Sequence, residues 1–189
     1  MSLLRFTIRR HILVMFGARF DILNSSLEVV GVCQQKAFKL KEDLRIYTDS
    51  TQTQESLAIK ARSIIDFSAA YDVQDSRTGE RLGTLQRKGF TSILRDSWIV
   101  MDADGVEVGK LQEDSWAKAL LRRFLSNLIP QSFHLQNTAG QELARFHQHF
   151  NPFRYSLDVE IEPDCELPPM LMVATGLLIA AIEGRQKSE

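Results

Sequence analysis

The chain has few cysteines and almost no excess charge, and each shortage argues against a class of function. Its two cysteines, Cys33 and Cys165, lack the close spacing of metal-binding motifs, and two isolated thiols suit a reducing cytoplasm. The formal net charge of −1 over 189 residues supplies no global positive field for nucleic acid. We therefore expect no nucleic-acid partner, and any contact with an anionic partner must use a local basic patch.

Signals for export and for catalysis are also missing. The longest uncharged stretch near the N-terminus, residues 12–18, is too short to cross a membrane, and no cleavage site follows it. No glycine-rich phosphate loop precedes a helix, and no nucleophile elbow is present. The sequence thus predicts a non-enzymatic protein without a cofactor or resident metal, located in the cytoplasm or peripherally at a membrane surface.

Long apolar runs are scarce too, except for one near the C-terminus. Residues 170–182 contain no charged side chain and a single hydroxyl, that of Thr175. Pro168 and Pro169 favour a helix start and Gly184 favours its end, which predicts a helix over residues 168–184. A helix that is apolar on all sides must be enclosed by protein or by lipid. At about 1.5 Å per residue the run is shorter than a hydrocarbon core of about 30 Å, so we favour enclosure by protein and keep a tail anchor as the alternative.

Most of the chain repeats one short pattern, in which two alternating apolar stretches flank a turn rich in Asp, Asn, Ser and Gly. This pattern predicts β-hairpins. Gly79, Gly105 and Gly140 supply the positive φ that tight turns often need, whereas the first two copies lack such a glycine. The five predicted hairpins cover residues 20–32, 44–59, 71–85, 98–111 and 133–146.

The strands and the apolar helix together predict the architecture. Residues 155–162 alternate most clearly and lead directly into the helix. With linking strands and a strand within residues 8–17, the chain provides about a dozen antiparallel strands. A closed barrel of that size is too wide for its own side chains to fill, whereas a helix about 10 Å across fits inside. We therefore predict a mainly β single domain over residues 1–189, a closed antiparallel barrel of about twelve strands around the C-terminal helix. The large side chains of residues 170–182 would be buried, and Gly176 and its neighbouring alanines would mark close approaches of the wall.

One segment departs from the β pattern and gives the best candidate for function. Residues 115–129 carry apolar side chains at helical spacing and end before Pro130, which predicts an amphipathic helix on the outside of the barrel. Its cations could meet lipid headgroups or an acidic partner, with a second basic group near the N-terminus extending the patch. The alternative is that the apolar stripe packs on a barrel end and the cations form a solvated rim. The candidate contact residues are Lys118, Arg122, Arg123, Arg9 and Arg10.

Two short motifs resemble metal sites. Asp102 and Asp104 begin like a calcium loop, but the alternation after them favours a hairpin turn. His147 and His149 would share one face of a strand and could bind a metal with His134 as a third ligand. For this pair we favour a polar exterior face.

The hairpins FDILN, LRIYTDS, YDVQDSRTGE and WIVMDADGVEVGKL, followed by the uncharged C-terminal helix, resemble the LURP-one-related and phospholipid scramblase group of the tubby C-terminal-like superfamily. The resemblance implies a twelve-stranded antiparallel barrel around a hydrophobic helix. Tubby proteins bind phosphoinositides through basic side chains, scramblases are associated with membranes and calcium, and many LURP-one-like members have no assigned biochemistry. Because this chain lacks the Cys-rich and Pro-rich N-terminal region of animal scramblases, palmitoylation and scrambling are not implied.

These observations predict a binding or scaffold module that associates peripherally with anionic phospholipid through a local basic patch. The alternative is a protein–protein interaction module without a lipid role. A weaker alternative is a tail-anchored membrane protein.

Overall fold

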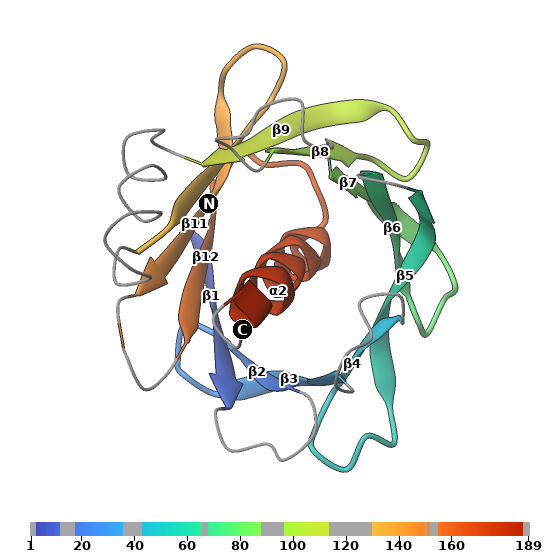
Figure 1. Cartoon of the computed structure of the whole chain (residues 1–189), viewed down its shortest axis with the longest axis vertical. Coiled ribbons are helices and arrows are strands. Elements are labelled where there is room, and N and C mark those ends of the chain that lie inside the picture. The colour runs from blue at the N-terminus through green and yellow to red at the C-terminus, as the bar shows by residue number, and fades with distance from the viewer. Residues whose placement is uncertain are drawn as a thin grey trace.

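The computed structural model describes residues 3–11, 18–35, 43–65, 68–87, 97–113, 130–149, 151 and 155–186. Twelve strands form one closed barrel, and helix α2 runs through its interior (Figure 1). Every neighbouring pair of strands is antiparallel. The predicted mainly β barrel around a C-terminal helix is therefore confirmed.

The strands follow one another around the barrel in sequence order. The elements are β1 (Leu4–His11), β2 (Ala18–Leu23), β3 (Val29–Gln35), β4 (Leu44–Tyr47), β5 (Glu55–Ile65), β6 (Ser68–Asp75), β7 (Arg81–Arg87), β8 (Ser97–Met101), β9 (Glu107–Glu113), β10 (Ser132–Gln136), β11 (Glu142–His149), β12 (Ser156–Ile161) and α2 (Pro169–Gln186). The five predicted hairpins are the pairs from β2–β3 to β10–β11. The N-terminal strand begins earlier than predicted, and it closes the barrel by pairing with β12, as Ile8 does with Leu157.

Helix α2 forms the centre of the core. Every residue from Leu171 to Ala181 is buried, so enclosure by the protein is confirmed for this part of the predicted helix. Met170, which we expected to be buried, is only partly so because it lies in the first turn, where the helix enters the barrel. Within the described residues, no helix is both long and apolar enough to cross a membrane.

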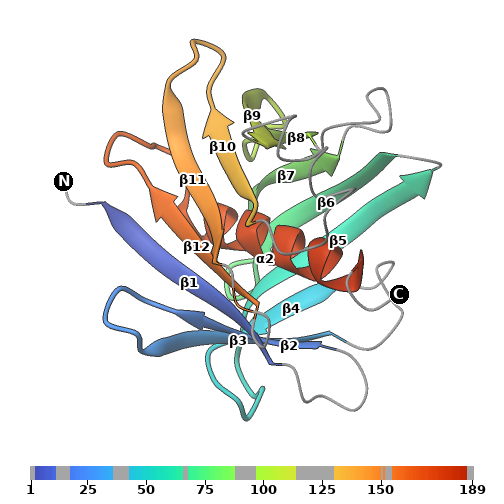
Figure 2. The same ribbon diagram turned by 60° about the vertical axis from the view of Figure 1, so that its left-hand side comes forward.

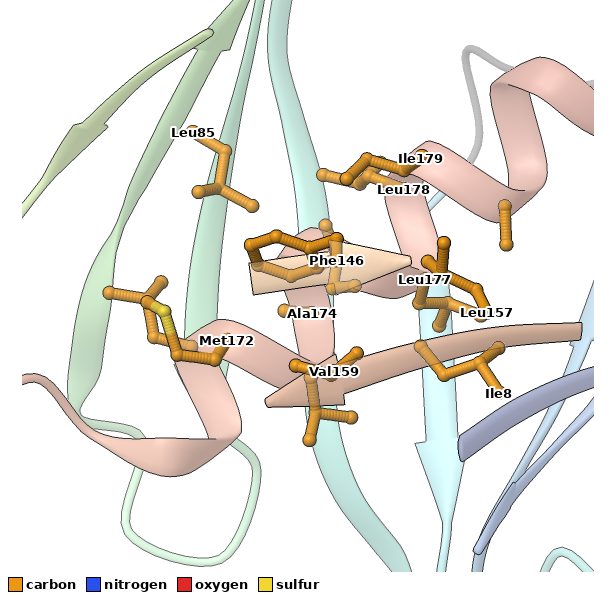
Figure 3. Close-up of a cluster of buried hydrophobic side chains, with 14 of the residues drawn as sticks. Ile8, Leu85, Phe146, Leu157, Val159, Met172, Ala174, Leu177, Leu178 and Ile179 are labelled. Atoms are coloured by element: carbon orange, nitrogen blue, oxygen red, sulfur yellow. The ribbon is translucent and has the colours of Figure 1, made fainter. Parts of the chain in front are cut away.

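The barrel wall comes closest to α2 at Gly176, as expected. A Cβ at this position would lie 2.8 Å from Ile8 Cδ1 and 2.8 Å from Val159 Cγ2. Figure 3 shows Ile8, Leu157 and Val159, from the two strands that close the barrel, gathered along the helix beside Leu177. The small residue therefore allows β1 and β12 to pack directly against the helix backbone.

Cys33 belongs to this core, and its burial makes a chemical prediction. Burial raises the pKa of the Cys33 thiol to about 12, although a backbone hydrogen bond from Arg45 acts in the opposite direction. Cys165 is only partly buried, and burial raises the pKa of its thiol as well. Because the thiolate is the nucleophile, iodoacetamide at pH 8 should alkylate Cys165 at least about tenfold faster than Cys33 in the native protein. Mass spectrometry of timed samples would measure both rates, and equal rates without denaturant would contradict the buried position of Cys33.

The two ends of the barrel differ in their connections. The connections at one end, here called the turn end, are described: residues 24–28, 48–54, 76–80, 102–106, 137–141 and 162–168. β1 starts and α2 enters at this end (Figure 2). The predicted amphipathic helix, residues 115–129 with Lys118, Arg122 and Arg123, falls between β9 and β10 in the sequence and lies outside the described residues.

Candidate functional site

The turn that resembled a calcium loop is a hairpin turn closed by its own backbone. Asp102 N donates to Val106 O at 3.0 Å, and Gly105 N donates to Asp102 O at 3.2 Å. Asp102 Oδ1 accepts hydrogen bonds from the backbone N–H groups of Asp104 and Val106, both at 2.9 Å. The carboxylate thus caps the turn from inside, and the predicted hairpin reading is confirmed.

Two further turns at this end have the same five-residue construction. In the β10–β11 turn, Asn137 Oδ1 accepts from Ala139 N and Gln141 N. In the β2–β3 turn, Asn24 Oδ1 accepts from Ser26 N at 2.9 Å and from Glu28 N at 3.0 Å. The neutral side chains of Asn24 and Asn137 accept the same backbone hydrogen bonds as Asp102. Closing the turn therefore requires a side-chain oxygen acceptor and no bound metal ion.

The fourth position of each of these turns has a positive φ. Gly105 and Gly140 occupy it at φ 85° and 82°, whereas the β2–β3 turn places Leu27 there at φ 62°. The left-handed region costs an L-residue with a side chain roughly 1–2 kcal/mol. Leu27 is nevertheless 61% exposed, so burial of its side chain does not offset that cost.

Other large apolar side chains are exposed around Leu27. Val29 and Val30 follow the turn at a β-bulge, where Leu23 pairs with Val29 and Ile22 pairs with Gly31. β1 begins at this same end of the barrel, beside β2. We call the group the apolar tip; it consists of Leu3, Leu4, Leu27, Val29 and Val30, each at least 44% exposed.

Beside the apolar tip, the outer face of five adjacent strands carries all four histidines of the chain. Residues of β10, β11, β12, β1 and β2 alternate between the core and the exterior, so every second side chain faces outward. We call this surface the histidine wall. Its ionisable side chains are Arg5, Arg9, His11, Arg19, Asp21, His134, Glu142, Arg145, His147, His149, Asp158 and Glu160.

The predicted exterior face for His147 and His149 is confirmed. Both side chains are exposed, and their ring centroids lie 5.2 Å apart. His149 Nε2 lies 2.8 Å from Asp158 Oδ2, while His147 Nδ1 lies 2.9 Å from Ser132 Oγ. His134 instead bonds to Glu142. In the described part of the chain, no group of three or more His, Cys, Asp or Glu residues could hold a metal ion.

In the described ion pairs of this wall, the arginine or histidine is more exposed than its carboxylate partner, except that His134 and Glu142 are about equally exposed at 25% and 23%. The side chain of Arg5 is 52% exposed and that of its partner Glu160 is 18% exposed. His149 and Asp158 show the same difference, at 50% and 16%. The difference in exposure follows from side-chain length. The shorter Asp and Glu side chains lie close to the strand, whereas the longer Arg and His side chains extend over the carboxylates into the solvent. The wall therefore presents cationic and histidine groups to the solvent although its formal charges nearly cancel.

One carboxylate of the wall has a shifted pKa. Partial burial acts to raise the pKa of Glu142, but the hydrogen bonds and positive charges of His134 and Arg145 outweigh it and hold that pKa below its usual value. Glu142 therefore remains ionised throughout the neutral and mildly acidic range.

The structure separates two predicted contact residues that are adjacent in sequence. Arg9 pairs with Asp21 and Ser156 on the outer face, and within the described residues it forms no ion pair. Arg10 pairs with the buried Phe20, so its side chain lies on the inner face, where burial lowers the pKa of its guanidinium. Arg9 and Arg10 therefore do not form one patch, because successive residues of a strand point to opposite faces.

Several buried polar side chains were missed by sequence reasoning. Gln35, Gln131, Gln148 and Glu113 are buried on strand ends far from the turn end. Gln35 Nε2 is buried without a hydrogen-bond partner among the described residues. The sequence signal that could have identified them is a polar residue at a strand position where the alternating pattern places a core side chain.

Comparison with known proteins agrees with the fold. No curated protein and no solved structure matches the chain. A family model described as LURP-one-related matches residues 29–180, which run from β3 through all the following strands and into α2. The protein therefore belongs to the LURP-one-related family.

Proposed function

We propose that the protein is a non-enzymatic binding module that associates peripherally with anionic phospholipid surfaces. The observation that carries this proposal is the outward position of the cations on the histidine wall, where Arg5 and His149 cover their carboxylate partners. An anionic surface that approaches the wall meets guanidinium and imidazole groups first. Basic side chains near an anionic membrane contribute about 1 kcal/mol each, and this contribution falls within a Debye length.

The occupied interior also favours a surface role. Helix α2 fills the barrel axis from Leu171 to Ala181, so this volume is not available for a ligand. Binding through the outer wall leaves that core intact. The predicted contact residues Lys118, Arg122 and Arg123 are not part of the histidine wall. Their contribution to lipid binding can be tested separately, by substituting them in the same vesicle assay.

Vesicle sedimentation tests the proposal. The protein should sediment with vesicles that contain phosphatidylglycerol, should remain in the supernatant with phosphatidylcholine alone, and should be released at 0.5 M salt because exposed charges are then screened. The double variant Arg5→Gln, Arg145→Gln should bind about thirtyfold more weakly, since it removes two charges that lie on the wall on either side of Glu160.

A matched control lies elsewhere on the barrel. Arg45 and Arg62 form similar outer ion pairs with Glu55 and Asp72, on β4 to β6. Arg45→Gln, Arg62→Gln should therefore bind vesicles like the wild type. If both double variants lose vesicle binding equally, binding depends on the overall charge of the protein and not on the histidine wall. If no vesicle composition binds the protein, the lipid role is wrong and a protein–protein interaction module becomes the better hypothesis.

A further inference from the structure

The apolar tip has no packing explanation within the barrel. Leu27 occupies the position that Gly105 and Gly140 occupy in the two sister turns, and it adopts the same left-handed backbone. A leucine at this position strains the backbone, yet 61% of the residue remains exposed. Strain that the fold does not use points to a role outside the fold.

The neighbourhood of the tip indicates what its partner is. Leu4 is the first residue of β1 and Leu3 precedes it, and the register that pairs Thr7 with Leu23 directs both towards the β2–β3 turn. The apolar tip is thus continuous with the histidine wall, whose outermost groups are positive. Exposed apolar side chains beside basic ones match the boundary between anionic headgroups and acyl chains.

The β2–β3 turn carries one negative charge, that of Glu28, which would repel an anionic membrane only weakly. Glu28 Oε2 accepts a hydrogen bond from Asn24 Nδ2 at 2.8 Å, so the carboxylate is turned back towards the base of the hairpin. Val29 and Val30 follow it and are both exposed, because the β-bulge interrupts the alternation there. The turn therefore presents apolar side chains on both sides of Glu28.

We propose that the apolar tip enters the headgroup–acyl boundary of an anionic membrane and orients the histidine wall against its surface. This inference rests on the proposed lipid association and adds the element that inserts. Figure 2 shows the β2–β3 turn and the start of β1 extending from the same end of the barrel. Insertion therefore requires no opening of the barrel and no movement of α2.

The decisive variant is Leu27→Asn. Asparagine tolerates the left-handed backbone and removes the apolar side chain, so the midpoint of thermal unfolding should equal or exceed that of the wild type. Binding to phosphatidylglycerol vesicles should fall about fivefold to tenfold, the loss expected for one large apolar side chain that no longer leaves water. A stable variant with weaker binding is not the result of misfolding.

Val106 provides the matched control. It is 60% exposed and is the last residue of the sister turn, which joins β8 and β9, two strands outside the histidine wall. Val106→Asn should bind vesicles like the wild type. Tryptophan fluorescence adds a direct readout: Leu27→Trp should show a blue-shifted emission on vesicles after subtraction of the wild-type spectrum, and Val106→Trp should not.

The outcomes separate the two proposals. If the wild type binds anionic vesicles but Leu27→Asn binds equally well and Leu27→Trp shows no shift, the apolar tip does not insert, while the lipid association stands. If the wild type binds no vesicles, both proposals are wrong. If Val106→Asn loses as much binding as Leu27→Asn, exposed apolar area in general is responsible and the assignment to this tip is overturned.

Discussion

Ala180→Asp is expected to abolish folding of the barrel. Ala180 has no exposed surface and lies among the apolar residues of α2 and of the wall that surrounds it. A carboxylate placed there must either remain charged without a partner or take up a proton, and each option costs several kcal/mol. Since the net stability of a typical domain is only about 5–15 kcal/mol, we expect insoluble or unfolded protein. The soluble fraction and thermal unfolding followed by circular dichroism would measure the effect.

Two other variants show whether the position or the chemistry is responsible. Val106→Asp introduces the same carboxylate at an exposed turn residue and should unfold within a few degrees of the wild type. Leu177→Ala removes apolar volume from the buried face of α2 without adding charge, and it should cost about 2–5 kcal/mol. A soluble Ala180→Asp protein with a wild-type unfolding midpoint would show that α2 is not enclosed as described.

The barrel could be predicted because its determinants are local. Alternation fixes which side chains face inward, Gly79, Gly105 and Gly140 mark turns, and the absence of any polar face on α2 requires enclosure. Each signal is contained within about twenty residues. Closure of the barrel followed from strand number and helix size, without knowledge of which strands meet.

The histidine wall could not be predicted because its determinants are distant in sequence. Thr7 meets Asp158 only because β1 and β12 close the barrel, and Asp158 in turn meets His149. No local pattern joins residues near the two ends of a chain. Whether Arg9 and Arg10 share one patch does not follow from their being neighbours in sequence, because alternation along β1 directs Arg9 to the outer face and Arg10 to the inner face.

The exposed position of Leu27 could not be predicted, because an apolar residue within a hairpin pattern usually belongs to the core. Its meaning emerges only when the β2–β3 turn is compared with its two sisters, since all three share an Asn or Asp at the first position and a positive φ at the fourth. The comparison shows that Leu27 is unusual, because the two sister turns have glycine at this position. Internal repetition of a motif can therefore reveal a functional residue where a single copy cannot.

Binding to anionic vesicles is expected to strengthen as the pH falls from 7.5 to 5.5. Histidine is the side chain that gains positive charge in this range, and all four histidines lie on the wall. The sign follows directly, because protonation adds positive charge to a surface that faces an anionic one. At about 1 kcal/mol per added charge, two to four added charges should strengthen binding by roughly thirtyfold to a thousandfold.

Two of the histidines, His11 and His149, face carboxylates of the neighbouring strands. His11 Nε2 lies 2.6 Å from Asp21 Oδ2, and Arg19 shares that carboxylate at 3.3 Å. His149 faces Asp158, which also accepts a hydrogen bond from Thr7. A carboxylate thus lies within ion-pair distance of each of these two imidazoles, and an arginine shares the carboxylate of His11.

The remaining two histidines lie on β10 and β11. His134 faces Glu142, which it shares with Arg145. Because the pKa of Glu142 is held below its usual value, this carboxylate stays ionised at pH 5.5. His147 faces the hydroxyl of Ser132 and the ring of His149.

Replacement of all four histidines by glutamine tests the source of the pH effect. The variant should bind vesicles at pH 7.5 like the wild type and should show little change at pH 5.5, because phosphatidylglycerol keeps its charge over this range and only the protein titrates. Thermal unfolding at both pH values must show folded protein, which the position of these side chains outside the core favours. If the variant retains the full increase in binding, the histidine wall is not the titrating surface. If the wild type shows no increase although it binds anionic vesicles, the wall does not face the lipid, and the apolar tip must orient another side of the barrel towards the membrane.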